Sequence, residues 1–253
     1  MALDGIVQNA KVGALGFDSN TVISSAVARQ FVTKGFTFCV RYVSRGPEPE
    51  KDLSPAEAER ILNAGLALMP VQHVRKPGWL PSAELGTKDG QYAASNTRDV
   101  GFPKGVNVWC DLEGIAPGTP ADIVAAYCNA WFDAVTAAGY VPGIYVGSQC
   151  ILNEQQLYQL KFQHYWRSQS NVPNSGKRGY QMIQLFPPVR INGVDVDIDV
   201  TQEDYKGDGT QWFVRATERV VRNLEANARP KEKTAASRRR KPQHGRRNLQ
   251  IHA

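Results

Sequence analysis

Apolar residues recur along the chain in short runs, either alternating with polar residues or continuous, as is typical of half-buried and fully buried β-strands. Turn residues or segments with helical spacing separate eight such runs. The predicted strands cover residues 12–18, 36–43, 66–72, 106–113, 141–146, 162–167, 180–186 and 194–200. Helical spacing follows the first five of them, at about residues 22–32, 54–65, 90–99, 120–138 and 154–160.

This alternation of strands and helices indicates an α/β fold with parallel strands in one closed sheet. The last three strands are joined by short Pro-, Gly- and Asn-containing segments with no room for full helices. The sequence therefore predicts a TIM-like β/α barrel over residues 1–212, in which the last three strands are sparsely connected. A doubly wound open sheet is the rival fold, but no Gly-rich phosphate loop follows the first strand.

Charge divides the chain into two parts of opposite sign. Residues 1–212 contain 18 Lys/Arg and 21 Asp/Glu, whereas residues 213–253 contain 12 Lys/Arg and 3 Asp/Glu. The net charge of +6 therefore belongs to the C-terminal part. We expect an amphipathic helix over residues 213–228, with Trp212 at its start, and a disordered basic tail over residues 229–253.

The N-terminal segment MALDGIVQNAK lacks the basic and apolar regions of a conventional signal peptide. No apolar run is long enough for a transmembrane segment. We therefore expect a cytoplasmic protein or one exported to the cell envelope by a non-standard route, and the sequence leaves its oligomeric state open.

Carboxylates gather at the predicted ends of three strands. Asp18 ends the first strand, Asp111 and Glu113 end the fourth, and the eighth contains Asp197 and Asp199. Taken singly, such residues are typical of helix caps or of the solvated face of an edge strand. In a closed barrel, however, the first and eighth strands are neighbours and the fourth lies opposite, so these side chains meet at the C-terminal face where active sites lie.

Crowding of carboxyl groups suggests acid chemistry. Because like charges repel, one carboxyl group in such a cluster must hold its proton near neutral pH. A protonated acid beside ionised partners is what glycosidic cleavage requires. No His/Asp spacing supports a metal site, and we expect no cofactor. Aromatic and amide residues that suit sugar binding are predicted at the same level: Tyr42, Gln72, Tyr145, Trp166 and Gln184.

Five motifs in order resemble a known family. They are GFDSN, the RYV of the second strand, the DLE of the fourth, the GIYVGS of the fifth and the VDVDIDV of the eighth. Over residues 12–204 the chain resembles the glycoside-hydrolase-like family catalogued as domain of unknown function 1906. That family is in turn similar to the family 25 muramidases, which cleave peptidoglycan with a barrel of five β/α units and three sparsely connected strands.

The resemblance implies a role for each carboxylate. Glu113 is the expected general acid, and Asp111 is expected to assist by orienting the N-acetyl group of the substrate. Asp18 and Asp197 are expected to complete the acidic floor, with Asp199 as the alternative match to Asp197 and a substrate contact in its own right. Tyr145 matches a tyrosine of the muramidase pattern.

Three functions remain open at this stage. The first is a glycosidase that acts on peptidoglycan or a related amino-sugar polysaccharide through Glu113. The second is a barrel that binds carbohydrate without cleaving it. The third concerns residues 229–253, whose arginine and lysine runs suit an anionic polymer or nucleic acid.

Overall fold

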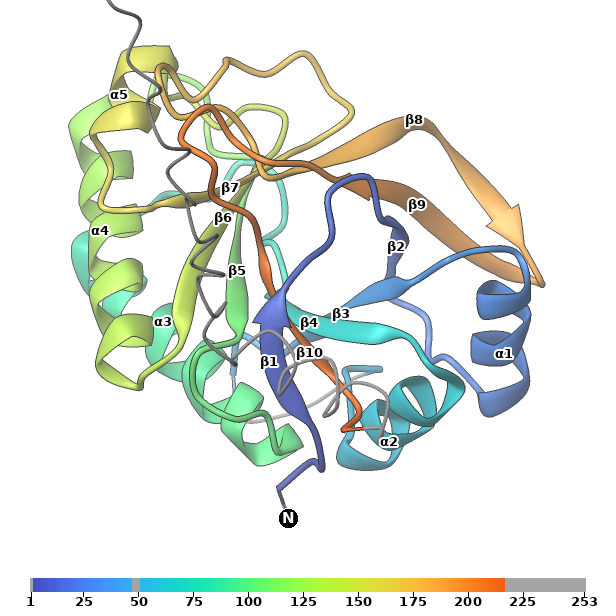
Figure 1. The fold of residues 1–253 in the computed structure, drawn as a ribbon. Helices are drawn as coiled ribbons and strands as arrows, with labels where there is room; N and C mark the ends of the chain where they lie inside the picture. The colour runs from blue at the N-terminus through green and yellow to red at the C-terminus, as the bar shows by residue number, and fades with distance from the viewer. Residues whose placement is uncertain (1, 47–50, 217–253) are drawn as a thin grey trace, which may run out of the picture. The chain divides into compact units, whose positions relative to one another are not determined.

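The computed structural model describes residues 2–46 and 51–216 of the chain, and Figure 1 shows their fold. Ten strands belong to one sheet, and eight of them close into a barrel through the pairing of β4 with β5. The strands are β1 (Ile6–Asn9), β2 (Leu15–Ser19), β3 (Phe38–Val43), β4 (Ala67–Gln72), β5 (Asn107–Leu112), β6 (Val141–Val146), β7 (His164–Arg167), β8 (Met182–Ile191), β9 (Val194–Thr201) and β10 (Gln211–Val214).

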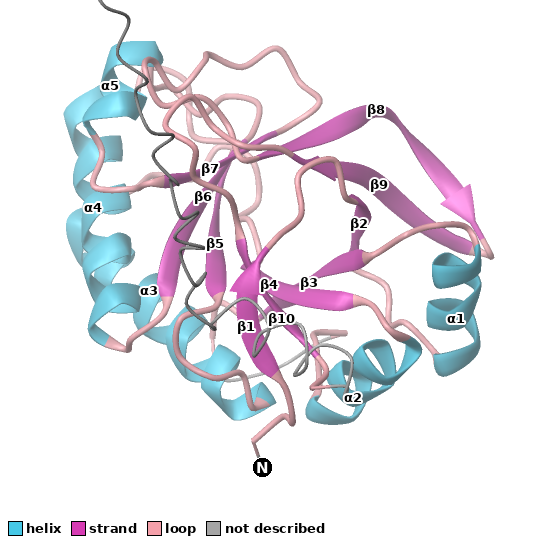
Figure 2. Ribbon diagram, in the orientation of Figure 1, coloured by secondary structure: helices cyan, strands magenta, loops and turns pink. Residues whose placement is uncertain are grey.

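The predicted closed α/β barrel is confirmed. Its strands follow one another around the ring in the order β2, β3, β4, β5, β6, β7, β8 and β9, so the first and last are neighbours. Five helices lie on the outside of the strands (Figure 2). They are α1 (Ser25–Thr33), α2 (Pro55–Ala64), α3 (Ala83–Val100), α4 (Ala121–Ala137) and α5 (Glu154–Gln159).

The expectation of uniformly parallel strands is wrong for β9. This strand pairs antiparallel with both β8 and β2. The reason is the two-residue turn at Asn192 and Gly193, whose φ angles of 54° and 79° are typical of a tight hairpin. Since a parallel pair needs a crossover connection, strands joined by so short a turn must run in opposite directions.

The expected helix over residues 213–228 is also wrong at its start. Trp212, Phe213 and Val214 belong to β10, which pairs antiparallel with β1 and joins this two-stranded ribbon to β4 through Phe213 and Leu68. Trp212 and Phe213 are buried in the core, which favours a strand here over an exposed amphipathic helix. Residues 217–253, with the rest of that helix and the basic tail, lie outside the described residues.

The buried apolar side chains form two cores, one inside the barrel and one between the strands and the helices. Inward-facing side chains, among them Trp109, Trp166 and Met182, fill the lumen. Outward-facing side chains of the same strands pack against the helices. Because side chains alternate along a strand, every second residue near a strand end points into the mouth of the barrel. None of the helices in the described ranges is long and apolar enough to cross a membrane.

Candidate functional site

Five carboxyl groups gather at one end of the barrel, and we call them the acidic cluster. The pairing of β2 with β9 places Asp18 directly opposite Asp197. Asp111 and Glu113 come from the C-terminal end of β5, on the far side of the ring. Asp18 occupies a position in β2 whose side chain points into the barrel. The other four carboxyl groups occupy inward-pointing positions of their own segments. The members of the acidic cluster are Asp18, Asp111, Glu113, Asp197 and Asp199.

Asp18 lies at the centre of a chain of hydrogen bonds inside the barrel. Gln184 Nε2 donates to Asp18 Oδ2 at 2.9 Å, and the Tyr42 hydroxyl donates to Asp18 Oδ1 at 3.3 Å. The Tyr145 hydroxyl donates to Gln184 Oε1 at 2.9 Å. Four strands thus fix the orientation of one carboxyl group, which is only 2% exposed. The predicted meeting of Asp18, Tyr42, Tyr145 and Gln184 is observed.

Asp199 lies deeper than Asp197, below the opening. It is fully buried, and Trp166 Nε1 donates to Asp199 Oδ1 at 2.9 Å. Burial raises the pKa of Asp199 well above its ordinary value, and the negative charge of Asp18 adds to the increase. Both effects favour the protonated form of Asp199.

The other carboxyl groups also favour protonation. Burial raises the pKa of Asp18 to about 7, with a contribution from the charge of Asp197. Burial and the charge of Glu113 raise the pKa of Asp111 well above its ordinary value. Burial raises the pKa of Glu113 as well, and the charge of Asp197 adds to it. The acidic cluster therefore retains protons at a pH where isolated carboxylates are ionised.

Glu113, the residue directly after β5, is partly open to solvent at this end of the barrel. Its side chain is partly exposed, whereas Asp111 beneath it is 8% exposed. Trp79 Nε1 donates to the Glu113 backbone carbonyl at 2.8 Å. A Cβ atom on Gly147 would lie 2.4 Å from Glu113 Cβ and 2.5 Å from Oε2, so only glycine leaves room for this side chain. Gly147, at the end of β6, is a residue that the sequence did not single out.

Asp197 is the accessible aspartate of β9. It is partly exposed, and Gln169 Nε2 donates to its Oδ1 at 3.3 Å. Burial raises the pKa of Asp197, while the hydrogen bond from Gln169 lowers it. Of these two alternatives, Asp197 is the partly exposed residue and Asp199 the buried one.

Two predicted sugar contacts are wrong on geometric grounds. Gln72 points outward, where its amide donates to the Asp89 carbonyl at 2.6 Å and its oxygen accepts from Trp131 Nε1 at 2.8 Å. Trp166 points inward but is 1% exposed, because it packs against Trp109 and Tyr145. The Gln72 amide is therefore directed away from the mouth of the barrel, and the Trp166 ring has no exposed face on which a sugar can stack. Asp199, fully buried, likewise cannot contact a substrate directly.

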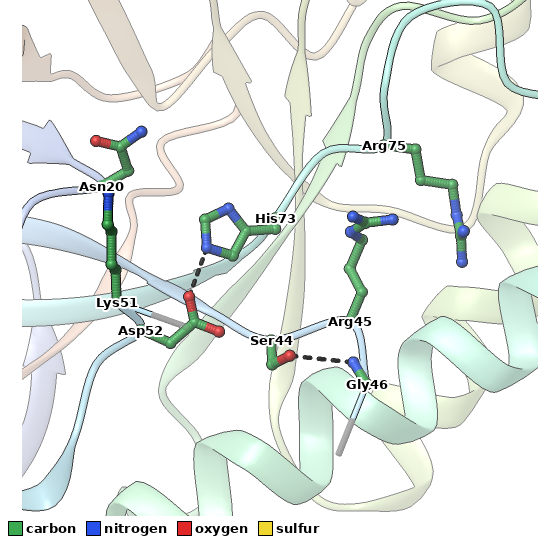
Figure 3. Close-up of a pocket in the computed structure, with 8 residues that line it drawn as sticks. All are labelled: Asn20, Ser44, Arg45, Gly46, Lys51, Asp52, His73 and Arg75. Atoms are coloured by element: carbon green, nitrogen blue, oxygen red, sulfur yellow. Dashed lines mark hydrogen bonds and ion pairs between the residues drawn. The ribbon is translucent and has the colours of Figure 1, made fainter. Parts of the chain in front are cut away.

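A cavity of about 570 Å³ opens beside the acidic cluster, over the ends of β2, β3 and β4. The sequence analysis missed it, although a signal was present, because basic residues follow closely after β3 and β4. Figure 3 shows its lining. We call it the basic cavity, and the residues that line it are Asn20, Ser44, Arg45, Gly46, Lys51, Asp52, His73 and Arg75. Within the described ranges, no group of three or more His, Cys, Asp or Glu side chains is arranged to hold a metal ion.

Solved structures with this fold include a glycosyl hydrolase and proteins described without an activity. The Mycobacterium tuberculosis Tat-secreted protein Rv2525c, in complex with HEPES, has a TM-score of 0.58 and 18% identity, covering 80% of this chain and 100% of that one. An uncharacterized B. stearothermophilus protein has a TM-score of 0.56 and 21% identity, with coverages of 75% and 96%. A family 25 glycosyl hydrolase from Bacillus anthracis has a TM-score of 0.51 and 11% identity, with coverages of 78% and 94%.

At such identities these likenesses establish the fold alone. No match is found among curated proteins. The family model for the Rv2525c-like, glycoside hydrolase-like domain matches residues 29–202, which is more than half of the chain. The resemblance drawn from the sequence motifs is therefore confirmed: this chain belongs to the Rv2525c-like family of glycoside hydrolase-like domains.

Proposed function

We propose that this chain hydrolyses glycosidic bonds in an amino-sugar polysaccharide of the peptidoglycan type, with Glu113 as the general acid. The observation that carries the proposal is the acidic cluster, in which Glu113 is partly exposed and has a raised pKa while buried carboxyl groups surround it. A general acid must hold its proton near the operating pH and still reach the substrate. The raised pKa of Glu113 favours the first condition and its partial exposure favours the second.

Glu113 donates its proton to the leaving oxygen of the scissile bond. The developing positive charge on the sugar is then offset by the neighbouring carboxylates. Asp111, directly below, orients the N-acetyl group as its oxygen closes on the anomeric carbon. Asp197 holds the substrate from the opposite wall and, by its charge, keeps the proton on Glu113. The ionised Glu113 then takes a proton from a water molecule that attacks the anomeric carbon, which reopens the N-acetyl ring and restores the acid. Asp18 and Asp199, whose pKa values are raised by burial, lie beneath this site.

The relatives support the substrate class. The family 25 glycosyl hydrolase of Bacillus anthracis and a lysozyme of Streptomyces coelicolor share the fold. The Streptococcus pneumoniae autolysin LytC, another protein of this fold, is known in complex with a synthetic peptidoglycan ligand. Because Rv2525c is Tat-secreted, we extend the proposal to a place of action outside the cytoplasm.

The test compares the wild type with Glu113→Gln on insoluble peptidoglycan. Released fragments are measured by mass spectrometry, and protein bound to the sediment is measured in parallel. We expect Glu113→Gln to slow fragment release by about 10²–10⁴-fold, the usual contribution of a general acid, while binding persists. Glu84→Gln, an exposed glutamate in the first turn of α3, is the matched control and is expected to retain full activity.

Two outcomes would contradict the proposal. If Glu113→Gln releases fragments at the wild-type rate, Glu113 is not the acid. If the wild type binds peptidoglycan but releases nothing, the chain is a carbohydrate-binding barrel that has kept the cleft without the chemistry.

A further inference from the structure

The basic cavity carries a charge opposite to that of its neighbour. Three cations line it, Arg45, Lys51 and Arg75, against one carboxylate, Asp52. Its volume of about 570 Å³ lies within the range of about 300–1,000 Å³ that is typical of ligand sites.

Two of the lining residues already have charged partners. Arg75 donates from Nε and Nη2 to the carboxylate of Asp89, at 3.1 and 2.5 Å. His73 Nε2 lies 2.5 Å from Asp52 Oδ1. The remaining cations, Arg45 and Lys51, have no ion pair within residues 2–46 and 51–216. The uncompensated positive charge of the basic cavity therefore comes from these two side chains.

Arg45 has the clearest unmet hydrogen-bonding capacity. Its Nε atom is buried, and in the described part of the chain it has no hydrogen-bond partner. A buried N–H group without a partner is costly, and a charged one more so. Figure 3 shows the Arg45 guanidinium on the same side of His73 as that of Arg75, facing the space between them. Guanidinium groups placed in this way bind carboxylate or phosphate oxygens through several N–H groups at once.

The position of Lys51 is fixed from inside the fold. Arg41 is fully buried, pairs with Glu57 at 2.7 Å and donates from Nη2 to the Lys51 carbonyl at 3.1 Å. Lys51 also adopts a φ of 54°, in the left-handed region that a non-glycine residue rarely occupies. A buried ion pair that holds this backbone keeps one wall of the cavity in place, as a preorganised site requires.

One aromatic pair connects the two regions. The Tyr42 hydroxyl donates to Asp18 in the acidic cluster, and the Tyr42 ring stacks on His73 at a centroid distance of 4.7 Å and an interplanar angle of 28°. A glycan that reaches Glu113 therefore has the basic cavity within reach of its neighbouring sugar. An anionic substituent on that sugar is repelled by the acidic cluster and attracted by Arg45 and Lys51.

We propose that the basic cavity is a subsite for an anionic substituent, a carboxylate or a phosphate, on the glycan, and that Arg45 and Lys51 are the residues that select it. The inference rests on the proposed function, since it takes the glycan to lie across the acidic cluster. It adds the substrate class, an anionic rather than a neutral amino-sugar chain, and places the anion over the ends of β2, β3 and β4.

The experiment measures binding rather than hydrolysis, in the Glu113→Gln background so that no ligand is consumed. Calorimetric titration of the full chain compares three tetrasaccharides. The first is neutral chitotetraose, the second alternates N-acetylglucosamine with N-acetylmuramic acid and carries carboxylates, and the third is chitotetraose bearing a 6-phosphate. We expect at least one anionic ligand to bind about tenfold more tightly than the neutral one, as one charge-assisted hydrogen bond provides. The anionic tetrasaccharide that binds more tightly than chitotetraose shows whether the cavity prefers a carboxylate or a phosphate.

Adding Arg45→Gln and Lys51→Gln is expected to abolish that preference and leave chitotetraose affinity unchanged. The matched control, Arg29→Gln with Lys34→Gln, removes the same charge from the exposed surface of α1 and its C-terminus and is expected to keep the preference. Equal affinity for all three ligands, no binding of any of them, or a preference that survives the Arg45 and Lys51 substitutions would overturn the inference. Fragment release by Glu113→Gln at the wild-type rate, with the preference intact, would instead count against the role of Glu113 alone.

Discussion

The acidic cluster and the basic cavity are neighbours built from different parts of the chain. Inward-facing positions of barrel strands supply the carboxylates, and the barrel closes around them. Segments that follow β2, β3 and β4 supply most of the basic cavity. Burial raises the pKa values of Asp18, Asp111 and Asp199, whereas the Lys51 side chain is exposed to water. The difference indicates that the barrel fixes the chemistry and that the loops adjust what it acts upon.

The largest expected effect comes from crowding the acidic cluster at Gly147. Gly147→Ala forces the Glu113 side chain to move, because the new methyl group occupies its place. A displacement of about 1 Å in a catalytic group costs on the order of 10²-fold in rate. Fragment release from peptidoglycan is the measurement. Gly209→Ala, outside both sites, is the control, because a Cβ atom there would meet only the Ala10 carbonyl oxygen, at 3.9 Å. Full activity in Gly147→Ala would show that the position of Glu113 does not matter.

The same substitution, Gln to Met, at two positions separates an effect on stability from an effect on the site. Gln72→Met on the outside of the barrel leaves the buried Trp131 Nε1 without its acceptor, whereas the Asp89 carbonyl lies inside α3 and keeps its helical hydrogen bond. We expect a loss of about 1–3 kcal/mol in the free energy of unfolding for the Trp131 donor, measured by urea denaturation, with hydrolysis unchanged. Gln184→Met in the lumen removes the amide donor to Asp18 and is expected to lower activity instead. A reversal of the two results would place the site on the wrong face of the strands.

The pH dependence of stability sharpens the same contrast. The pKa of Asp18 is raised from 3.8 to about 7, so between these values the folded chain holds a proton that the unfolded chain has lost. Stability is therefore greatest at low pH and falls as pH rises toward 7, by about 1.4 kcal/mol per unit for one proton. Denaturation from pH 4.5 to 7.5 should show a shallower decline in Asp18→Asn than in the wild type. Asp195→Asn, on the exposed end of β9, is the control. Parallel curves for Asp18→Asn and the wild type would show that Asp18 is ionised throughout.

The smallest effect concerns the basic residues at the C-terminus. Removing residues 229–253 is expected to weaken binding to anionic wall polymers at low salt, and the difference should vanish at high salt. Cosedimentation at two salt concentrations measures it. Affinity that does not change on truncation would leave the basic cavity as the cationic element that matters.

Much of the barrel and its acid chemistry followed from the pattern of residues. Alternation located the eight barrel strands, and closure brought Asp18 beside Asp197 as expected. The alternation of side chains along β4 excludes Gln72 from the mouth of the barrel. Met69 and Val71 face the lumen, so the residues next to them face outward. In the same way, the sequence Asn192–Gly193 is typical of a hairpin turn, and a hairpin makes β9 antiparallel to β8. These two errors came from signals present in the sequence but not applied.

The basic cavity could not be derived in that way. Its members lie on segments without regular periodicity, and the distances between them depend on tertiary contacts. The tie from Arg41 to the Lys51 carbonyl and the stack of His73 on Tyr42 are examples. A histidine that follows a strand does not reveal which carboxylate or ring it will meet. Sites formed by strand residues can therefore be predicted from the sequence pattern, whereas sites formed by loop residues cannot.

The reversed direction of β9 has a consequence for how this fold can diversify. Since β8 and β9 form a hairpin that continues past the end of β2, its tip at Asn192 and Gly193 stands clear of the ring (Figure 1). Residues added at that tip would raise a wall over the mouth without disturbing any β/α unit. Lengthening or shortening one ribbon is thus a simple route by which related chains could come to accept thin, branched or cross-linked polymers.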